Sequence, residues 1–147
     1  VRSRRQRQMC IRDSAEVVKM RDKMRGHLGS SATARKAGEF DLKHDDGGMI
    51  DIEFLCQYAV LSMGFETPDL LAWSDNIRIL ETLASSGRLP TDDAHRLRDA
   101  YLAYRDASHR HALTKTGKHV DEADSREHRQ AVSALWQRWL EPAEDGA

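Results

Sequence analysis

The chain has 147 residues, of which 39% are hydrophobic and 32% charged, and its formal net charge is −1. This length is sufficient for one domain with a buried core. No apolar run approaches the roughly 18 to 20 residues that a membrane-spanning helix requires. Only three prolines and nine glycines interrupt the sequence, which is typical of long helices.

Residues 1–14 differ from the rest because they hold five arginines and one acid. They lack the apolar stretch of a secretion signal and the amphipathic pattern of an organelle presequence. We interpret them as a non-native leader similar to translated adapter sequence, with a basic disordered tail as the alternative. If the leader is non-native, the natural chain begins upstream of Ala15 and this sequence is a fragment.

Outside this leader Lys+Arg falls from 23 to 18 and Asp+Glu from 24 to 23, so the remainder carries a charge of −5. Such an acidic body argues against a nucleic-acid partner. The chain has two cysteines, Cys10 in the leader and Cys56 in an apolar context. The absence of a disulfide framework fits a reducing compartment, so we predict a cytoplasmic protein in which Cys56 is a core residue rather than a nucleophile.

The first predicted helix covers residues 15–28 and ends before Gly29. Its apolar residues recur at steps of three and four and consist of Val17, Met20, Met24 and Leu28. Four basic residues lie off this stripe, namely Lys19, Arg21, Lys23 and Arg25. Two interpretations remain open: these residues form a solvated helix face, or some of them face a polyanion such as a triphosphate.

Residues 39–44 alternate as a strand does, with Phe40 and Leu42 on one side and Asp41 and Lys43 on the other. A single short strand is not stable alone, so this segment needs a partner elsewhere or is simply extended chain. The next segment, 49–63, is apolar on nearly every side and predicts a fully buried core helix that ends at Gly64.

Two further helices follow, with Thr67 as the cap of one that begins at Pro68, and Ser74 as the cap of one that Gly87 ends. The second of these carries an apolar stripe made of Ile77, Leu80, Leu83 and Ala84.

The next predicted helix starts at the Thr91 cap with acids in its first turn and breaks at Gly117. Its inward residues are predicted to be Ala94, Leu97, Tyr101 and Tyr104. The last helix covers about Ser125 to Leu140 and is closed by Pro142, with an inward stripe of Val132, Leu135, Trp136 and Trp139. The predicted fold is mainly α: an antiparallel bundle of five or six helices with at most one short strand.

Seven histidines raise the question of a metal site. His109 and His111 diverge by about 160° on a helix, so they cannot share a metal. The chain contains no His-Glu-x-x-His, Cys-x-x-Cys, Gly-x-Ser-x-Gly or complete P-loop motif. We therefore predict no metal ligands and no catalytic group of these kinds.

The sequence KHDDGGMIDIEF at residues 43–54 is the exception. Gly47 and Gly48 directly precede a helix, whose free N–H groups are a potential anion site that Lys43 can complete. The alternative is an ordinary glycine turn with a surface lysine and a dipole-favoured Asp51. If residues 50–54 are extended, Asp51 and Glu53 share a face and form a chelating pair; if they are helical, these acids diverge by about 200°.

Four blocks, at residues 40–61, 73–89, 100–113 and 132–142, resemble in order and spacing the bifunctional glutamine-synthetase adenylyltransferase/adenylyl-removing enzymes of bacteria. The similarity runs from about Ala15 to Pro142. A related Lys…Gly-Gly-x-x-Asp pattern occurs in the PII uridylyltransferases, and Lys43, Gly47, Gly48 and Asp51 fit it.

The resemblance implies that the chain is the end of the half that transfers AMP from ATP to a tyrosine of glutamine synthetase, while the other half removes AMP by phosphorolysis. Residues 15–64 would be the end of the catalytic region and residues 65–147 a C-terminal helical bundle. The family's two Mg²⁺ ions are held by carboxylates in strand motifs that this chain lacks. ATP and Mg²⁺ are therefore expected in the full enzyme, with no tightly bound cofactor and no transferase activity in the fragment.

The resemblance also favours function over the ordinary turn at residues 43–54. Lys43 is then predicted to contact phosphate, with Gly47 and Gly48 allowing close backbone approach. Asp51 is expected to orient the turn or the lysine, and Glu53 to support the helix. The alternative for the chain as a whole is a non-catalytic helical module, residues 65–142, that docks glutamine synthetase or a PII-type regulator.

Overall fold

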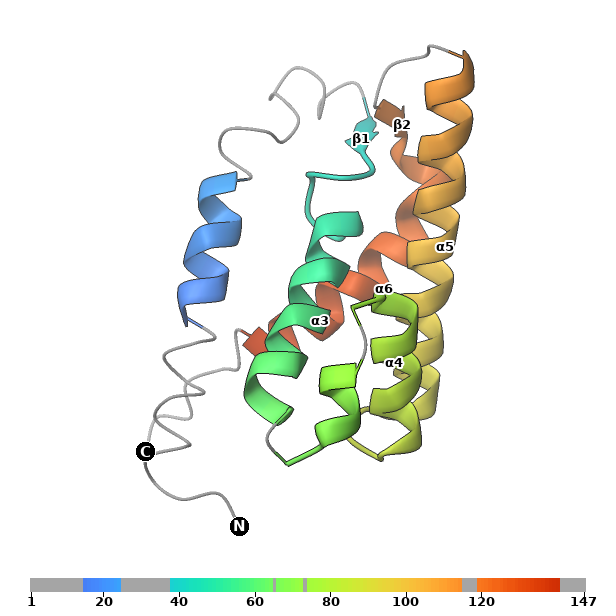
Figure 1. Ribbon diagram of the computed structural model, residues 1–147. Helices are drawn as coiled ribbons and strands as arrows, with labels where there is room; N and C mark the ends of the chain where they lie inside the picture. The colour runs from blue at the N-terminus through green and yellow to red at the C-terminus, as the bar shows by residue number, and fades with distance from the viewer. Residues whose placement is uncertain (1–14, 25–37, 65, 73, 115–118, 141–147) are drawn as a thin grey trace.

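The computed structural model describes residues 15–24, 38–64, 66–72, 74–114 and 119–140. Four predicted features lie outside these residues: the leader, the helix end at Gly29, the break at Gly117 and the closure at Pro142. Within the described part the chain is mainly helical, as predicted (Figure 1).

A helix over residues 15–24 comes first. The elements after it carry the labels of Figure 1, in which the helix numbers start at α3. These are β1 (Glu39–Asp41), α3 (Met49–Met63), the short 3-10 helix η1 (Pro68–Ala72), α4 (Asn76–Ser85), α5 (Thr91–Thr114), β2 (His119–Asp121) and α6 (Glu122–Leu140). No helix among these described segments is both long and apolar enough to cross a membrane.

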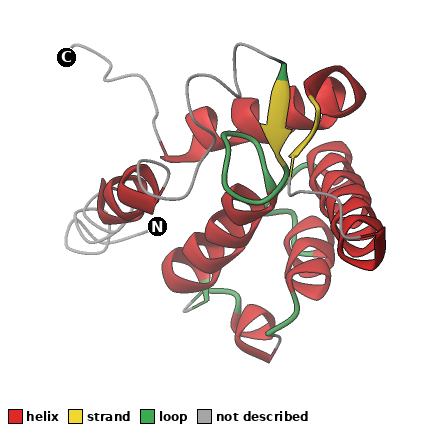
Figure 2. Ribbon diagram, turned by 90° about the horizontal axis from the view of Figure 1, so that it is seen from above, coloured by secondary structure: helices red, strands yellow, loops and turns green. Residues whose placement is uncertain are grey.

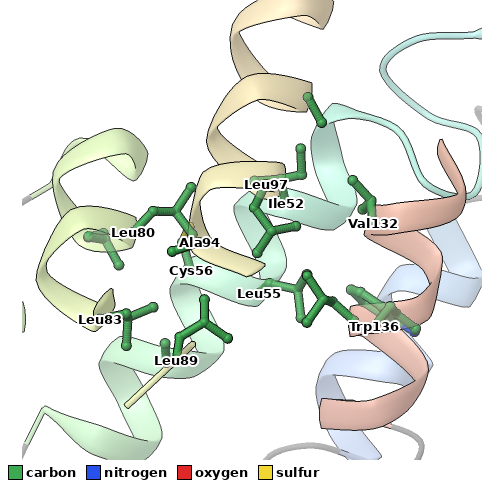
Figure 3. Packing of buried hydrophobic residues seen from close by; sticks show 14 of the residues in the cluster. Ile52, Leu55, Cys56, Leu80, Leu83, Leu89, Ala94, Leu97, Val132 and Trp136 are labelled. Carbon is green, nitrogen blue, oxygen red and sulfur yellow. The ribbon is translucent and has the colours of Figure 1, made fainter. Parts of the chain in front are cut away.

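Helix α3 is central to the bundle and packs against α4, α5 and α6. Figure 3 shows side chains from all four helices meeting in one cluster, among them Leu55, Leu80, Leu97 and Trp136. The prediction that α3 is buried on every side was wrong. Its buried apolar face consists of Ile52, Leu55, Cys56 and Ala59, whereas Leu61 is 60% exposed. Three helices and η1 cover one face of α3 and leave that side chain in solvent.

The two strands form an antiparallel pair in which Phe40 lies opposite Val120 (Figure 2). The strand predicted near residue 40 therefore has its partner immediately before α6, in a segment for which the sequence pattern predicted no regular structure. The alternation places Phe40 and Asp41 on opposite sides of the strand, and both side chains are fully buried. Asp41 is buried because its carboxylate accepts N–H groups of the loop that follows.

Helix ends follow local hydrogen bonding. Asp75, rather than the predicted Ser74, caps α4, since its carboxylate accepts the N–H of Ile77 at 2.8 Å. Helix α5 begins at Thr91, which the sequence predicted as its cap, and the carbonyl of the preceding Pro90 accepts the N–H of Ala94 at 3.0 Å. Helix α6 begins at Glu122, earlier than the expected Ser125.

The first helix turns a different face to the core from the one predicted. Met20 is 58% exposed, whereas Arg21 is only 2% exposed. Val17, Arg21 and Met24 also follow steps of four and three, so the observed stripe obeys the same helical period. The interpretation as a solvated face is wrong for Arg21, because its guanidinium is buried and binds carboxylates within the chain.

Candidate functional site

The turn between β1 and α3, residues 41–48, carries the residues that the sequence singled out. Gly48 N–H donates to the carbonyl of Asp45 at 2.9 Å, and Met49 N–H donates to that of Leu42 at 2.8 Å. Ile50 N–H donates to the carbonyl of Lys43 at 3.1 Å. Donors at the start of α3 are thus bonded within the chain, which leaves fewer of them for an anion than a bare helix N-terminus offers.

Asp41 organises the first half of this turn. Its Oδ1 accepts the N–H groups of Lys43 at 3.0 Å and His44 at 3.2 Å, and its Oδ2 lies 3.2 Å from Nδ1 of His44. The N–H of Asp41 in turn donates to Oδ2 of Asp45 at 3.0 Å. Both acids are buried. A buried carboxylate that accepts two N–H groups fixes the backbone of Lys43 in one conformation.

Asp51 joins the second half of the turn to the first helix. Its Oδ2 accepts the N–H of Gly47 at 2.7 Å, and its Oδ1 accepts from Nε of Arg21 in a buried ion pair. Burial raises the pKa of Asp51, while the hydrogen bonds from Arg21 and Gly47 act in the opposite direction. The carboxylate is therefore committed to internal partners.

The first turn of α3 is helical, so the alternative in which Asp51 and Glu53 diverge is the observed one. Glu53 is half-buried and its Oε1 lies 3.5 Å from the hydroxyl of Tyr101 on α5. The structure thus brings Lys43, Gly47, Gly48 and Asp51 together in one turn and directs Glu53 elsewhere.

The glycine pair permits close packing of the turn against the protein itself. Gly47 has φ +77°, and a Cβ there would lie 2.5 Å from the carbonyl oxygen of Arg129 and 2.9 Å from Oγ of Ser133. At Gly48 a Cβ would lie 2.6 Å from the carbonyl oxygen of Leu42. A side chain fits at neither position, so both glycines are required by the local structure whatever ligand the turn binds.

Helices α5 and α6 hold the turn from the opposite side. The hydroxyl of Tyr104 donates to the carbonyl of Gly47 at 2.8 Å, and Nε of Arg129 donates to that of Asp46 at 2.7 Å. Burial raises the pKa of Tyr104, so the hydroxyl keeps its proton and remains a donor. In contrast to these buried contacts of the turn, the side chain of Lys43 is exposed.

The sequence that forms this turn and the bundle matches a known protein family. The sequence model of the GlnD PII-uridylyltransferase family matches residues 18–137. The chain belongs to this family.

Two curated relatives agree with that assignment. The bifunctional glutamine synthetase adenylyltransferase/adenylyl-removing enzyme of Acinetobacter baylyi is 50% identical over 90% of this chain. The enzyme of the same name from Pseudomonas putida is 44% identical over 82% of the chain. The matched segments cover only 14% and 13% of the lengths of these two proteins. The resemblance inferred from the four sequence blocks is thereby confirmed.

Magnesium, which the resemblance implies for the whole enzyme, does not fit the carboxylates of the described residues. No group of three His, Cys, Asp or Glu side chains in the described segments has the arrangement of a metal site. Asp41 and Asp51, the buried acids nearest the predicted phosphate contact, already accept N–H or guanidinium hydrogen bonds. No step through a metal ion is therefore assigned to this part of the chain.

Sequence reasoning missed several residues that build the turn. Asp41 and Asp45 are acids near the glycine pair, and nothing in the local sequence pattern indicated that both are buried. Arg21 carried one signal, its spacing of four residues from Val17 and three from Met24, which places all three on one helix face. Tyr104 was predicted to face inward, which is confirmed, but its hydroxyl partner was not foreseen.

Proposed function

We propose that this family member forms the end of the transferring half of an enzyme that moves AMP from ATP to a tyrosine hydroxyl of glutamine synthetase. The tyrosine oxygen attacks the α-phosphorus and pyrophosphate leaves. The two relatives carry the adenylyltransferase name, and their greater length provides room for the Mg²⁺-binding carboxylates outside the matched segment. In the same full enzyme a second half would remove AMP by phosphorolysis.

The observation that carries a role for this segment is the placement of Lys43. Its backbone N–H is held by the buried carboxylate of Asp41 at 3.0 Å, while its side chain is exposed beside the first turn of α3. A lysine on a fixed backbone loses less conformational entropy when it meets an anion than one on a mobile loop does. We therefore propose that Lys43 contacts a phosphate of ATP.

The other predicted site residues act as supports in this proposal. Gly47 and Gly48 let the turn lie close to α6 and to the Leu42 carbonyl, so that Lys43 has a fixed platform. Asp51 holds the N–H of Gly47, and Glu53 supports the packing of α3 on α5 through Tyr101. None of these four residues is assigned a direct part in the transfer step.

The first test uses the isolated chain of 147 residues. Incubated with ATP, Mg²⁺ and glutamine synthetase, it is expected to transfer no AMP, measured as incorporation of labelled AMP into glutamine synthetase. Transfer above the background without added chain would show that the catalytic carboxylates lie within this sequence.

The second test uses the full-length enzyme that contains this sequence. Replacing Lys43 by Ala is expected to raise KM for ATP at least about tenfold, because a charge-assisted contact contributes about 1.5–3 kcal/mol. Lys23→Ala, which removes an exposed lysine from the first helix, is the matched control and should leave KM for ATP unchanged. Equal KM values for both variants would refute the phosphate role.

The alternative function is a helical docking module for glutamine synthetase or a PII-type regulator. Two large apolar side chains of the later helices are exposed, Leu71 at 64% and Leu113 at 79%, and these are the positions to test. Pull-down of the isolated chain with purified glutamine synthetase and PII protein tests it. Binding that Leu71→Ser or Leu113→Ser abolishes would support the docking function, and no binding to either protein would exclude it.

A further inference from the structure

Arg21 is the one cation of the described chain that is almost completely buried at 2% exposure, and it lies where the first helix meets the turn before α3. Figure 1 shows the first helix, residues 15–24, beside α3. The guanidinium pairs with Asp51, lies 3.0 Å from Oδ1 of Asp46 through Nη2, and stacks 5.7 Å from the ring centroid of Trp136 on α6. A charge with this degree of burial requires such partners, because an unpaired buried ion is strongly destabilising.

The carboxylate of Asp51 connects Arg21 to the turn before α3. One of its oxygens accepts from Arg21 and the other accepts the N–H of Gly47 at 2.7 Å. The carbonyl of Gly47 accepts the hydroxyl of Tyr104 at 2.8 Å. Gly47 is therefore held at its N–H by Asp51, which Arg21 binds, and at its carbonyl by Tyr104 of α5.

Lys43 is tied to the same helical turn. Its carbonyl accepts the N–H of Ile50, which directly precedes Asp51, at 3.1 Å. If Arg21 is removed, Asp51 becomes a buried carboxylate without its cation, and it must take up a proton or move toward water. Either change alters the hydrogen bond to Gly47 and the first turn of α3, on which the backbone of Lys43 depends.

We propose that Arg21 is a positioning residue for phosphate binding. It acts through Asp51 on residues 43–48 and so sets the place of Lys43, which couples the first helix to the nucleotide-contacting turn. This inference rests on the proposed function, since it assumes that Lys43 contacts phosphate. It adds a residue outside the predicted site, from an element that the glycine-lysine pattern does not include.

The test measures binding of inorganic tripolyphosphate to the full 147-residue chain by NMR titration. Arg21→Gln is expected to weaken binding about tenfold, as Lys43→Ala does, because both lose the same charge-assisted contact. The double variant should bind no more weakly than Lys43→Ala alone, since the two residues act through one contact. Lys23→Gln removes the same charge from an exposed position of the first helix and should change affinity less than about twofold.

A second measurement separates positioning from general loss of stability. Amide hydrogen exchange of Gly47 is expected to accelerate in Arg21→Gln at least about tenfold more than exchange of Leu97 in the core of α5. If Arg21→Gln fails to fold, Arg21→Lys replaces it: the charge is kept, the fork that reaches both Asp51 and Asp46 is lost, and binding is expected to weaken about threefold.

The outcomes distinguish the two proposals. If Lys43→Ala weakens binding and a folded Arg21 variant does not, Arg21 has no positioning role and the function proposed for Lys43 stands. If Lys43→Ala leaves binding unchanged, the phosphate role of Lys43 and the positioning of Lys43 for phosphate are both refuted. Additive losses in the double variant, or uniform acceleration of exchange at Gly47 and Leu97, would reduce Arg21 to a stabilising residue.

Discussion

Arg21 and Asp51 form a buried ion pair between the first helix and α3, with their side chains 2% and 3% exposed. The two residues are 30 positions apart in the sequence. Because the same carboxylate holds Gly47, this pair connects the docking of one helix to the shape of a turn.

Removing both charges of this pair should be less harmful than the effects of the two single changes added together. Arg21→Gln or Asp51→Asn alone is expected to lower the free energy of unfolding by about 3–5 kcal/mol, because each leaves a buried group without its partner. The double variant should be less destabilised than the sum of the two singles by at least about 1 kcal/mol. Urea unfolding followed by circular dichroism measures all three, with Lys23→Gln as the control. Strict additivity would mean that the two groups do not interact.

Gly47 and Gly38 share the same φ of +77° but differ in their surroundings. Gly38→Ala should cost about 1–2 kcal/mol, the penalty of a left-handed conformation, because nothing lies within 4 Å of the new Cβ. Gly47→Ala should cost at least about 2 kcal/mol more, since its Cβ would collide with the backbone of Arg129. Thermal unfolding of both variants gives the comparison, and equal losses would show that α6 adjusts without cost.

Tyr104 supplies the only hydroxyl among the described residues that bonds to the Gly47 carbonyl. Tyr104→Phe is expected to destabilise the chain by about 1–3 kcal/mol, because it leaves a buried acceptor without a donor. Tyr101→Phe is the control and should cost less, since Tyr101 is only half-buried and its contact with Glu53 is 3.5 Å long. A larger loss for Tyr101→Phe in chemical denaturation would contradict this assignment.

Cys56 should be inert in the native state. Burial raises the pKa of its thiol from 9.0 to about 12, and its Sγ lies 3.8 Å from the carbonyl of Asn76. In a Cys10→Ser background, Cys56 is expected to react with a disulfide reagent at pH 8 only when the chain unfolds. Rapid labelling of the folded chain would show that the thiol is accessible.

The raised pKa of Cys56 also predicts the direction in which the stability of the chain changes with pH. The unfolded thiol loses its proton above its ordinary pKa of 9.0, whereas the folded thiol retains it up to about pH 12. The native state therefore binds more protons in this range, and stability falls as the pH rises through it. Cys56→Ala should remove that part of the alkaline loss, which unfolding curves at pH 8 and pH 10 can measure. An unchanged slope would assign the loss to other groups.

The cap of α4 gives a sharp local test. Asp75→Ala should cost about 1 kcal/mol, because its carboxylate accepts the N–H of Ile77, whereas Ser74→Ala should cost less than about 0.5 kcal/mol. Thermal unfolding of the two variants distinguishes the neighbours. A larger effect at Ser74 would restore the cap that the sequence pattern predicted.

The helices were predictable because their patterns are long. The apolar character of residues 49–63 on nearly every side located α3, and repeated apolar spacing located α5 and α6 within a few residues. Thr91, predicted as the cap of α5, is its first residue. The strand pair was only half predictable: β1 has an alternating pattern, but β2 is three residues long and is defined by its partner. Local sequence does not encode a pairing between distant segments.

The candidate site was also predictable only in part. Lys43 and the glycines were found from their spacing beside a helix start, because glycine and lysine have properties that depend little on tertiary structure. For Arg21 a solvated helix face was one of two open interpretations, since charged side chains are usually exposed, and Asp41 was placed only on the side of the strand opposite Phe40. The helical spacing of Arg21 from Val17 and Met24 is a local signal of its burial, but its partners are carboxylates that it meets only in the folded chain, as are the N–H groups that Asp41 binds.

The bond between Arg129 and the Asp46 carbonyl spans 83 positions, and it has a consequence for synthesis on the ribosome. The turn before α3 leaves the ribosome long before α6 does, so its acids and glycines are made well ahead of the helix that closes over them. Contacts of such long range are costly to form early in folding. The turn should therefore acquire its final shape late, only after the last helix has been released, and until then this stretch of nascent chain should be open to chaperones and proteases.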